Sequence, residues 1–331
     1  MLTTTDRTDE RVGEDGVVTK YPAPAGRTAR RLEWQFLPPA LRAEIERRCG
    51  SAVTRAETQN SGFTPGFASV LTCADGSKHF VKAASVKAQR PFAEAYREEG
   101  RKLALLPAGV PAPRLRWMLE EEWVVLGIEY VEGRMPARPW RAADLDATLD
   151  ALEGIAAELT PAPAAMRLQS FADEFGEWVG FWDYVRTTQP GLPHLEEAAA
   201  LAAGFAQACS GDTMVHTDVR DDNLLIDPGG RVWLCDWNWP VVGANWLDSF
   251  FTLIGPRGDG LDVERVIAER RLLSGVPAEH LDRALALLVG YFFKQRDEPV
   301  PSTSPHIRDH QSWQGDVCWA WLCERRGWSL A

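Results

Sequence analysis

One segment of the chain combines the residue types that phosphoryl transfer requires. Residues 215–223 read Val-His-Thr-Asp-Val-Arg-Asp-Asp-Asn, and Asp236 follows further along the chain. Transfer to a hydroxyl needs a carboxylate that orients the nucleophile and receives its proton, and oxygen ligands that hold Mg²⁺ against the phosphates. Asp218, Asn223 and Asp236 supply such a set, since two of them are carboxylates and the third has an amide oxygen. An asparagine five positions after the aspartate is also the spacing of protein-kinase catalytic loops. The segment therefore predicts Mg²⁺-dependent phosphoryl transfer to a hydroxyl group.

The sequence between these residues indicates how they can meet. Residues 224–227 and 231–235 are strand-like and flank a Pro-Gly-Gly turn, which predicts a hairpin. Because a hairpin returns the chain to its starting point, Asp236 can reach the same ion as Asn223. We expect His216 to brace this loop through hydrogen bonds, which is a more frequent role for histidine than that of an acid or a base.

A lysine and a glutamate outside this segment form a second candidate pair. Residues 67–72 and 78–83 flank Ala-Asp-Gly-Ser and predict another hairpin, whose second strand carries Lys82 among apolar residues. Residues 91–106 follow a helical period that places Glu99 on the apolar stripe, with Glu98 about 100° away from it. An unpaired buried carboxylate is costly, so Lys82 is the expected partner of Glu99.

The predicted secondary structure changes near residue 131 from β-rich to mainly helical. A short helix over residues 39–48, two hairpin strands, one main helix and a strand over residues 123–131 precede this point. The sequence after it is mainly helical, over residues 142–159, 171–185, 195–209, 262–273, 278–293 and 312–326. We therefore predict an α+β protein with a loose tail at residues 1–26, a small β-rich N-lobe with one main helix over 27–131, and a larger, mainly helical C-lobe over 132–331.

Charge disfavours nucleic acid as a partner. The net charge is −11, and residues 131–331 carry 17 Lys and Arg against 30 Asp and Glu. An acidic surface repels phosphates and would suit a cationic ligand, although a merely solvated acidic face explains the same numbers.

Targeting and cysteine patterns are those of a protein of the cytoplasm. Residues 1–26 are polar and lack an export signal, and the longest apolar stretch, residues 284–293, is about half of a membrane-spanning helix. The six cysteines are scattered without a C-x-x-C pair, so we expect neither disulfides nor a metal site built on thiolates.

Several other enzyme classes are excluded by missing motifs. The sequence has no Gly-x-Ser-x-Gly nucleophile elbow and no Gly-x-x-x-x-Gly-Lys-Ser/Thr phosphate loop. It also lacks the His-Arg-Asp, Asp-Phe-Gly and Ala-Pro-Glu motifs of protein kinases.

The segment resembles the signature loop of the aminoglycoside phosphotransferase family, in which His-Gly-Asp is followed by an asparagine five residues after the aspartate. The similarity extends from about Gly62 to Trp328. It implies a protein-kinase-like two-lobed fold that binds ATP and Mg²⁺. It further implies that Asp218 is the catalytic base and that Asn223 and Asp236 are the Mg²⁺ ligands.

The resemblance also assigns the nucleotide site. Lys82 would hold the α- and β-phosphates and Glu99 would orient it, with Glu98 as the fallback. The phosphate-covering loop would contain Ser61, Gly62, Phe63 and Gly66, and the adenine would bind backbone groups of the connector at Glu129 and Val131.

The chain departs from the family pattern near the catalytic aspartate. Thr217 stands where the family has glycine, so this loop lacks the conformational freedom of that residue. Arg220 adds a positive charge that could steady the transferring phosphate or pair with Asp221 or Asp222, and we favour the pairing. The C-terminal end is basic where family members that act on aminoglycosides often place acidic residues, which argues against an aminoglycoside acceptor.

We therefore expect an ATP-dependent kinase for a small, hydroxyl-bearing and possibly cationic acceptor, such as an antibiotic or antibiotic-like compound. The alternatives are a kinase for a metabolite (an amino sugar, sugar or amino alcohol) and a catalytically silent nucleotide-binding regulator. The sequence offers acidic and tryptophan candidates for the acceptor site: Asp173, Glu174, Glu177, Asp183, Asp248, Trp237, Trp239 and Trp246.

Overall fold

The computed structural model describes residues 11–12, 18–19, 21–24, 29–59 and 61–329. Most of the expected tail at residues 1–26 therefore lies outside the described residues. Among the described residues no helix is both long enough and apolar enough to cross a membrane.

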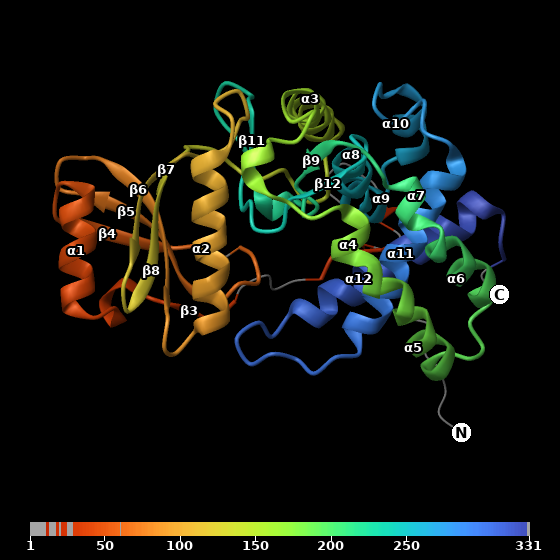
Figure 1. Ribbon diagram of the computed structural model, residues 1–331, viewed down its shortest axis with the longest axis horizontal. Helices are drawn as coiled ribbons and strands as arrows, with labels where there is room; N and C mark the ends of the chain where they lie inside the picture. The colour runs from red at the N-terminus through yellow and green to blue at the C-terminus, as the bar shows by residue number, and fades with distance from the viewer. Residues whose placement is uncertain (1–10, 13–17, 20, 25–28, 60, 330–331) are drawn as a thin grey trace.

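A six-stranded sheet dominates the first part of the chain. Its strands are β3 (Arg31–Leu32), β4 (Val53–Thr58), β5 (Gly66–Cys73), β6 (Lys78–Ser85), β7 (Leu115–Glu120) and β8 (Trp123–Glu129). The order is β3-β5-β6-β8-β7, with β4 also paired to β5, and only the β3–β5 pairing is parallel. Helix α1 (Pro39–Cys49) covers one face of the sheet and α2 (Arg90–Leu105) covers the other (Figure 1).

Local sequence explains the two helices. Pro39 stands at the first position of α1, where its missing N–H costs nothing, and Gly50 ends the helix with φ of 84°. In α2, Ala93, Tyr96 and Leu103 are buried at helical spacing, as the sequence period predicts. The predicted main helix and hairpin are thus confirmed.

The rest of the chain is mainly helical, and its longest helices are α3 (Ala142–Glu158), α11 (Ala278–Arg296) and α12 (Ile307–Arg326). Two predicted helices are interrupted. Residues 171–185 form α4 (Phe171–Phe175), a 3-10 turn (Gly176–Gly180) and α5 (Phe181–Thr188), while residues 195–209 form α6 (Leu195–Ala203) and α7 (Phe205–Ala208). Glycines lie at these breaks, and glycine weakens a helix interior. The helix predicted over 262–273 is shorter, α10 (Val263–Glu269), and Asp262 caps it by accepting from the Arg265 N–H.

Short elements frame residues 215–223, which we call the catalytic segment after their predicted role. The predicted hairpin is formed by β10 (Leu224–Ile226) and β11 (Val232–Leu234), and β9 (Thr213–Val215) pairs with β12 (Val241–Gly243). The strands β9 and β12 and the helices α8 (Leu247–Thr252) and α9 (Ile254–Gly258) were not predicted, because segments this short show no clear period. Residues 216–223 thus leave β9 and enter β10.

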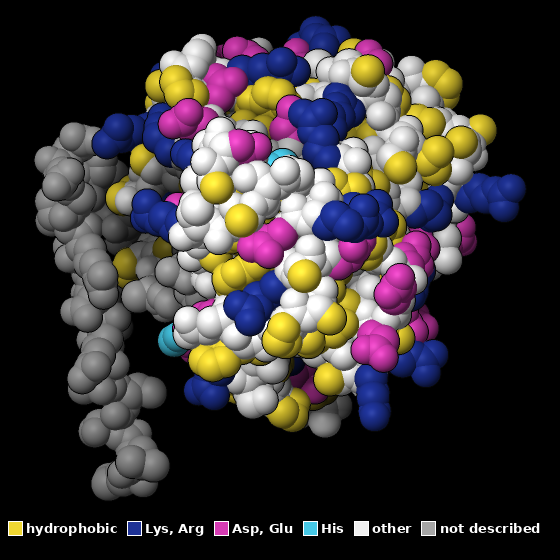
Figure 2. All heavy atoms as spheres, turned by 90° about the vertical axis from the view of Figure 1, so that its left-hand side faces the viewer, with side chains coloured by type: hydrophobic (Ala, Val, Ile, Leu, Met, Phe, Trp, Pro, Cys, Tyr) yellow, Lys and Arg dark blue, Asp and Glu magenta, His cyan; other side chains and the backbone are white. Residues whose placement is uncertain are grey.

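Two hydrophobic clusters organise the packing. The larger one joins the α2 face of the sheet to the helical part, and the smaller one fills the space between α1 and the other face of the sheet. Figure 2 views the molecule from the α1 side, where basic and acidic side chains are interspersed over the described surface.

Candidate active site

A cavity of about 700 Å³ lies between the sheet-rich part and the helical part of the molecule. It is bordered by β5, β6, α2 and the connector after β8 on one side, and by the catalytic segment, α11 and α12 on the other. Five of the predicted residues line this single space: Lys82, Glu99, Asp218, Asn223 and Asp236. The structure therefore brings together groups that are separated by up to 154 positions.

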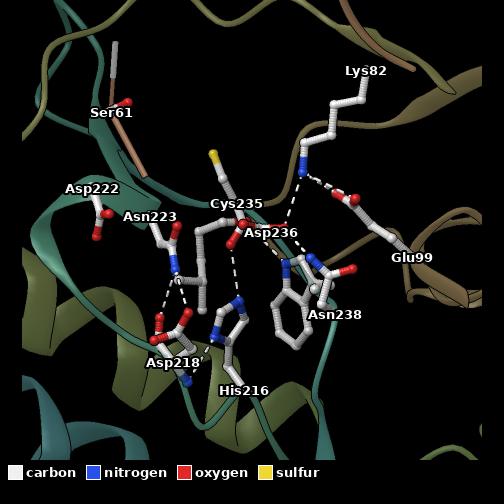
Figure 3. Close-up of polar contacts among 12 residues, drawn as sticks. Ser61, Lys82, Glu99, His216, Asp218, Asp222, Asn223, Cys235, Asp236 and Asn238 are labelled. Atoms are coloured by element: carbon white, nitrogen blue, oxygen red, sulfur yellow. Dashed lines mark hydrogen bonds and ion pairs between the residues drawn. The ribbon is translucent and has the colours of Figure 1, made fainter. Parts of the chain in front are cut away.

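Lys82 connects the two sides of the cavity. Its ammonium donates to both carboxylate oxygens of Glu99, at 2.7 and 2.9 Å, and to Oδ1 of Asp236 at 3.0 Å (Figure 3). Glu99 is 1% exposed, so its predicted place on the buried face of α2 is confirmed. Glu98 instead lies on the exposed side and pairs with Arg101. The fallback pairing of Lys82 with Glu98 is therefore wrong.

Burial and charge act in opposite directions on Lys82 and Asp236. Burial disfavours the charged amine, but the neighbouring Asp236 and Glu99 outweigh it and raise the pKa of Lys82 above its ordinary value. Burial likewise opposes ionisation of Asp236, but Lys82 holds the pKa of this carboxyl below its ordinary value. Lys82 is thus a fixed cation, and Asp236 is an anion beside it.

The catalytic segment is braced by His216, as predicted from the sequence. The Nε2–H of this buried imidazole donates to the Cys235 carbonyl at 2.9 Å, and its Nδ1 accepts from the Asp218 N–H at 3.2 Å. Because Nδ1 can accept only in the neutral ring, the imidazole is uncharged, and burial lowers the pKa of His216 accordingly. One ring therefore ties the start of the loop to the end of the β10–β11 hairpin.

Asp248 holds the same loop from behind. Its carboxylate accepts from the backbone N–H groups of His216 at 2.7 Å and Thr217 at 2.8 Å, and the residue is buried. As an acceptor-binding candidate Asp248 is therefore wrong, because both oxygens already serve the loop. Thr217 has φ of 69°, a conformation that β-branched residues rarely adopt, and these bonds help to hold it.

Asp218 has the setting of a general base. Its carboxylate lies at the wall of the cavity and accepts from the Nδ2 of Asn223 at 3.0 Å (Figure 3). Burial raises the pKa of Asp218 to about 6, with Asp222 and Asp236 adding to this and Arg220 opposing it. A carboxylate whose pKa lies just below neutrality is both ionised at pH 7 and basic enough to accept a proton.

Arg220 pairs with two carboxylates at once. It lies 3.1 Å from Asp222, the pairing favoured from the sequence, and 3.3 Å from Asp218. Asp221 faces away and pairs with Arg138 at 3.4 Å. Arg220 thus places positive charge directly beside the candidate base.

The donor set fits a hard divalent cation. Asn223 donates through Nδ2 to Asp218, which leaves its Oδ1 as an acceptor, and Asp236 contributes a carboxylate. The buried Oδ1 of Asn238, whose amide donates to Asp236, has no hydrogen-bond partner among the described residues. Carboxylate and amide oxygens are the ligands that Mg²⁺ prefers.

Comparison with known proteins places this arrangement in context. The sequence matches no protein-family model and no curated protein. The structure, however, is similar to that of a spectinomycin phosphotransferase in complex with ADP and spectinomycin, which is 11% identical, with a TM-score of 0.62 over 89% of this chain and 99% of that chain. A choline kinase from Streptococcus pneumoniae is 14% identical, with a TM-score of 0.54 over 86% and 98% of the two chains. An aminoglycoside phosphotransferase from Alicyclobacillus acidocaldarius is 15% identical, with a TM-score of 0.53 over 83% and 92%.

The chain has the kinase-like fold of the aminoglycoside phosphotransferases. The predicted α+β fold with a small sheet-rich part and a larger helical part is thereby confirmed. At these low identities the similarity establishes the fold, and the roles of individual residues rest on the geometry of the site.

The predicted phosphate-covering loop, which starts at Ser61, is anchored from two directions. Arg31 donates through Nη2 to the Ser61 carbonyl at 2.7 Å, and Ser304, which precedes α12, donates to the Phe63 carbonyl. Gly62 has φ of 83° and borders the cavity with Ser61 and Phe63. Gly66 does not border it, since this residue is buried where β5 begins.

The connector of this kinase-like fold also borders the cavity, through Glu129, Tyr130 and Val131. The Glu129 carboxylate is engaged by Arg116 at 2.6 Å and by the Arg114 N–H at 3.1 Å. A ligand at this position would therefore meet backbone groups rather than that carboxylate.

Few of the proposed acceptor residues reach the cavity. Among the acidic candidates only Glu174 borders it, while the Asp173 carboxylate accepts from the hydroxyl of Ser170, the N-cap residue of α4, and Asp183 pairs with Arg186. Of the three tryptophans only Trp239 borders it, at 57% exposed, because Trp237 and Trp246 are buried.

The structure adds residues that the sequence did not reveal. Trp178 and Tyr291 stack with ring centroids 3.9 Å apart and form an aromatic wall that Phe175 and Phe292 extend. His310 and Gln311 of α12 also border the cavity. Helical aromatics at such spacing read as core residues, so no sequence signal separates them. Arg31 was missed because its strand has only two residues.

Proposed function

We propose that this protein is a Mg²⁺- and ATP-dependent phosphotransferase that transfers the γ-phosphoryl group to a hydroxyl of a small molecule. One observation carries the proposal: Asp218, Asn223 and Asp236 converge on one cavity with the buried cation Lys82. The solved structures with the same fold include small-molecule phosphotransferases, and several of them contain ADP or AMP.

Each residue has a role that follows from its position. The connector at Glu129 and Val131 would meet the adenine, and the region 27–131 would supply most of the nucleotide site. Lys82, held by Glu99, would bind the α- and β-phosphates beneath the loop of Ser61, Gly62 and Phe63. Gly66 would shape this loop without contacting the nucleotide.

Asn223 and Asp236 would hold Mg²⁺, which supplies charge neutralisation for the phosphates. Asp218 would orient the acceptor hydroxyl and take its proton as the new P–O bond forms and ADP leaves. Arg220, 3.3 Å from Asp218, would turn toward the transferring phosphate, whose negative charge competes with Asp222 for the guanidinium. His216 would act by holding the loop in place.

The acceptor would occupy the end of the cavity that residues 132–331 build. The Trp178–Tyr291 wall and the single carboxylate of Glu174 favour an acceptor with an apolar body and at most one or two positive charges. We infer an antibiotic or antibiotic-like alcohol as this acceptor. The choline kinase among the structures of the same fold supports the second candidate, a metabolite such as an amino alcohol or sugar.

The test is transfer of label from γ-labelled ATP to a panel of aminoglycosides, macrolides, nucleoside antibiotics, sugars and amino alcohols. Replacing Asp218 with asparagine keeps the side-chain shape and removes the base, so kcat should fall about 10²- to 10⁴-fold. Transfer to a metabolite alone would remove the antibiotic as acceptor. ATP binding by the native protein without transfer to any hydroxyl would favour the silent regulator and overturn the proposal.

A further inference from the structure

Three metal-ligating side chains gather on the face of the sheet opposite the cavity. Cys49 is the last residue of α1, Cys73 is the last residue of β5, and His79 lies near the start of β6. One ligand atom from each of the three lies within 4.8 Å of the other two. The residues come from three separate elements, so their spacing in the sequence forms no recognisable zinc motif.

The strand register explains why they meet. His79 pairs with Leu71 across the β5–β6 ladder, and Cys73 lies two positions beyond Leu71 on the same face. Leu71 belongs to the hydrophobic cluster beneath α1, and the end of α1 brings Cys49 to the same place. Both cysteines have free thiols.

The hydrogen bonds of the turn set the tautomer of His79. Ser77 Oγ donates its single proton to Asp75 Oδ1 at 2.7 Å and lies 3.1 Å from Nε2 of His79. Nε2–H must therefore donate to Ser77, which leaves a lone pair on Nδ1. Chains of this kind, from carboxylate to imidazole, orient metal-binding histidines in proteins.

We propose that Cys49, Cys73 and His79 bind a Zn²⁺ ion, with a water molecule as the fourth ligand. Two thiolates and one imidazole are a ligand set that zinc accepts, at about 2.3 Å from sulfur and 2.0–2.1 Å from nitrogen. A tetrahedral site needs these atoms about 3.4–3.8 Å apart, so a small closure of the present cluster suffices. His79 is partly exposed, which leaves room for the water ligand.

The zinc would tie α1 to the β5–β6 hairpin without touching the nucleotide site. Side chains of β6 alternate, so Lys78, Phe80 and Lys82 face the cavity while His79 and Val81 face α1. The ion would therefore support from behind the strand that carries Lys82. Its binding is independent of the phosphotransferase activity proposed above.

The experiment is a Co²⁺ titration of the full-length protein after reduction and removal of bound metal with a chelator. We expect one equivalent of Co²⁺ to produce a thiolate-to-cobalt charge-transfer band and the visible bands of a tetrahedral site, and Zn²⁺ to abolish both. C73S and H79Q should each lower the cobalt affinity by at least about 100-fold, and D75A by about 10-fold because it removes the orienting carboxylate.

The controls separate this site from the others. C209S removes a buried thiol elsewhere, and D236N removes a proposed Mg²⁺ ligand, so both should keep the charge-transfer band. Zn²⁺ should raise the Tm of the native protein and of C209S but not that of H79Q, whose histidine is partly exposed and whose loss leaves the core intact. Absence of the band in the native protein, its persistence in H79Q, or a Cys49–Cys73 disulfide whose reduction yields no cobalt binding would overturn the proposal.

Discussion

The two ends of the cavity are built in opposite ways. The end near Lys82 is a hydrogen-bonded network that joins the charged groups of Lys82, Glu99 and Asp236 to the amide of Asn238. The end near Trp178 is an aromatic wall with one carboxylate, Glu174, at its edge. A triphosphate and a metal ion require fixed charges, whereas an acceptor is selected by shape. We therefore expect changes at the first end to affect every acceptor equally, and changes at the second end to affect acceptors one by one.

Among the changes that compare the two ends, the largest effect should come from D236N. Asparagine keeps the size of the side chain and tolerates the φ of 65° at this position, so the change removes a charge and little else. Loss of a metal ligand from a preorganised site should lower kcat by about 10³-fold for every acceptor. Single-turnover transfer from labelled ATP measures this effect. E98Q, a carboxylate change on the exposed side of α2, should leave kcat unchanged, and an equal loss in both variants would contradict the assignment.

R31A should have the next largest effect, at the same end of the cavity. Arg31 lines the cavity, and its buried Nε has no hydrogen-bond partner among the described residues. A bound phosphate would supply that partner. Hydrogen bonds to charged groups contribute about 2 kcal/mol, so the KM for ATP should rise about 30-fold while the acceptor KM stays constant. R30A is the matched control, and a normal KM for ATP in R31A would place the guanidinium outside the phosphate site.

W178A tests the other end. Removing the indole opens the stack with Tyr291, and the loss of an aromatic contact costs about 1.4 kcal/mol. The acceptor KM should rise about 10-fold for apolar acceptors and much less for small polar ones, with the KM for ATP unchanged. W233A, which removes a tryptophan that packs on Arg231 away from the cavity, is the control. An equal rise in the KM of every acceptor would contradict the expectation that this end of the cavity distinguishes one acceptor from another.

The two ends also differ in how far the sequence predicted them. Asp218, Asn223 and Asp236 were predicted to meet because their residue types and spacing suit phosphoryl transfer, and the structure brings them to one cavity. Glu99 was predicted from its place on an apolar stripe. Trp178 and Tyr291 lie on segments where aromatic residues look like core. The role of Asp248 depends on the packing of α8 behind the loop, which no local pattern reveals.

The pH dependence of kcat should come from the charged end. The proposed base Asp218 can accept a proton only when it is ionised, and burial raises its pKa to about 6, so activity should rise with pH through that value and level off above it. A group with this pKa is about one-quarter ionised at about pH 5.5, which predicts a roughly fourfold lower kcat there. The same profile should appear with each acceptor, and a midpoint that shifts from acceptor to acceptor would show that the acceptor, not Asp218, titrates.

The smallest effect concerns backbone strain beside Asp218, the proposed base. Thr217 has φ of 69°, and its Oγ1 donates to the Trp239 carbonyl at 3.0 Å. Alanine and glycine at this position both lose that bond, but only glycine relieves the left-handed backbone, which costs other residues about 1–2 kcal/mol. The greater entropy of glycine in the unfolded chain opposes this gain by about 0.5–1 kcal/mol. T217G should therefore be more stable than T217A by about 0.5–1 kcal/mol in urea unfolding.

The matched pair lies in a regular strand. At Thr213, in β9, the backbone has no such conformation, and T213G should therefore be less stable than T213A. Glycine-minus-alanine stability differences of opposite sign at the two positions would show that the backbone at Thr217 is strained. The two hydrogen bonds from the loop to Asp248 hold it in that conformation. A T217A variant as stable as T217G, or more stable, would contradict the prediction. It would show that the backbone at Thr217 is not strained and that the threonine contributes only its hydrogen bond to the Trp239 carbonyl.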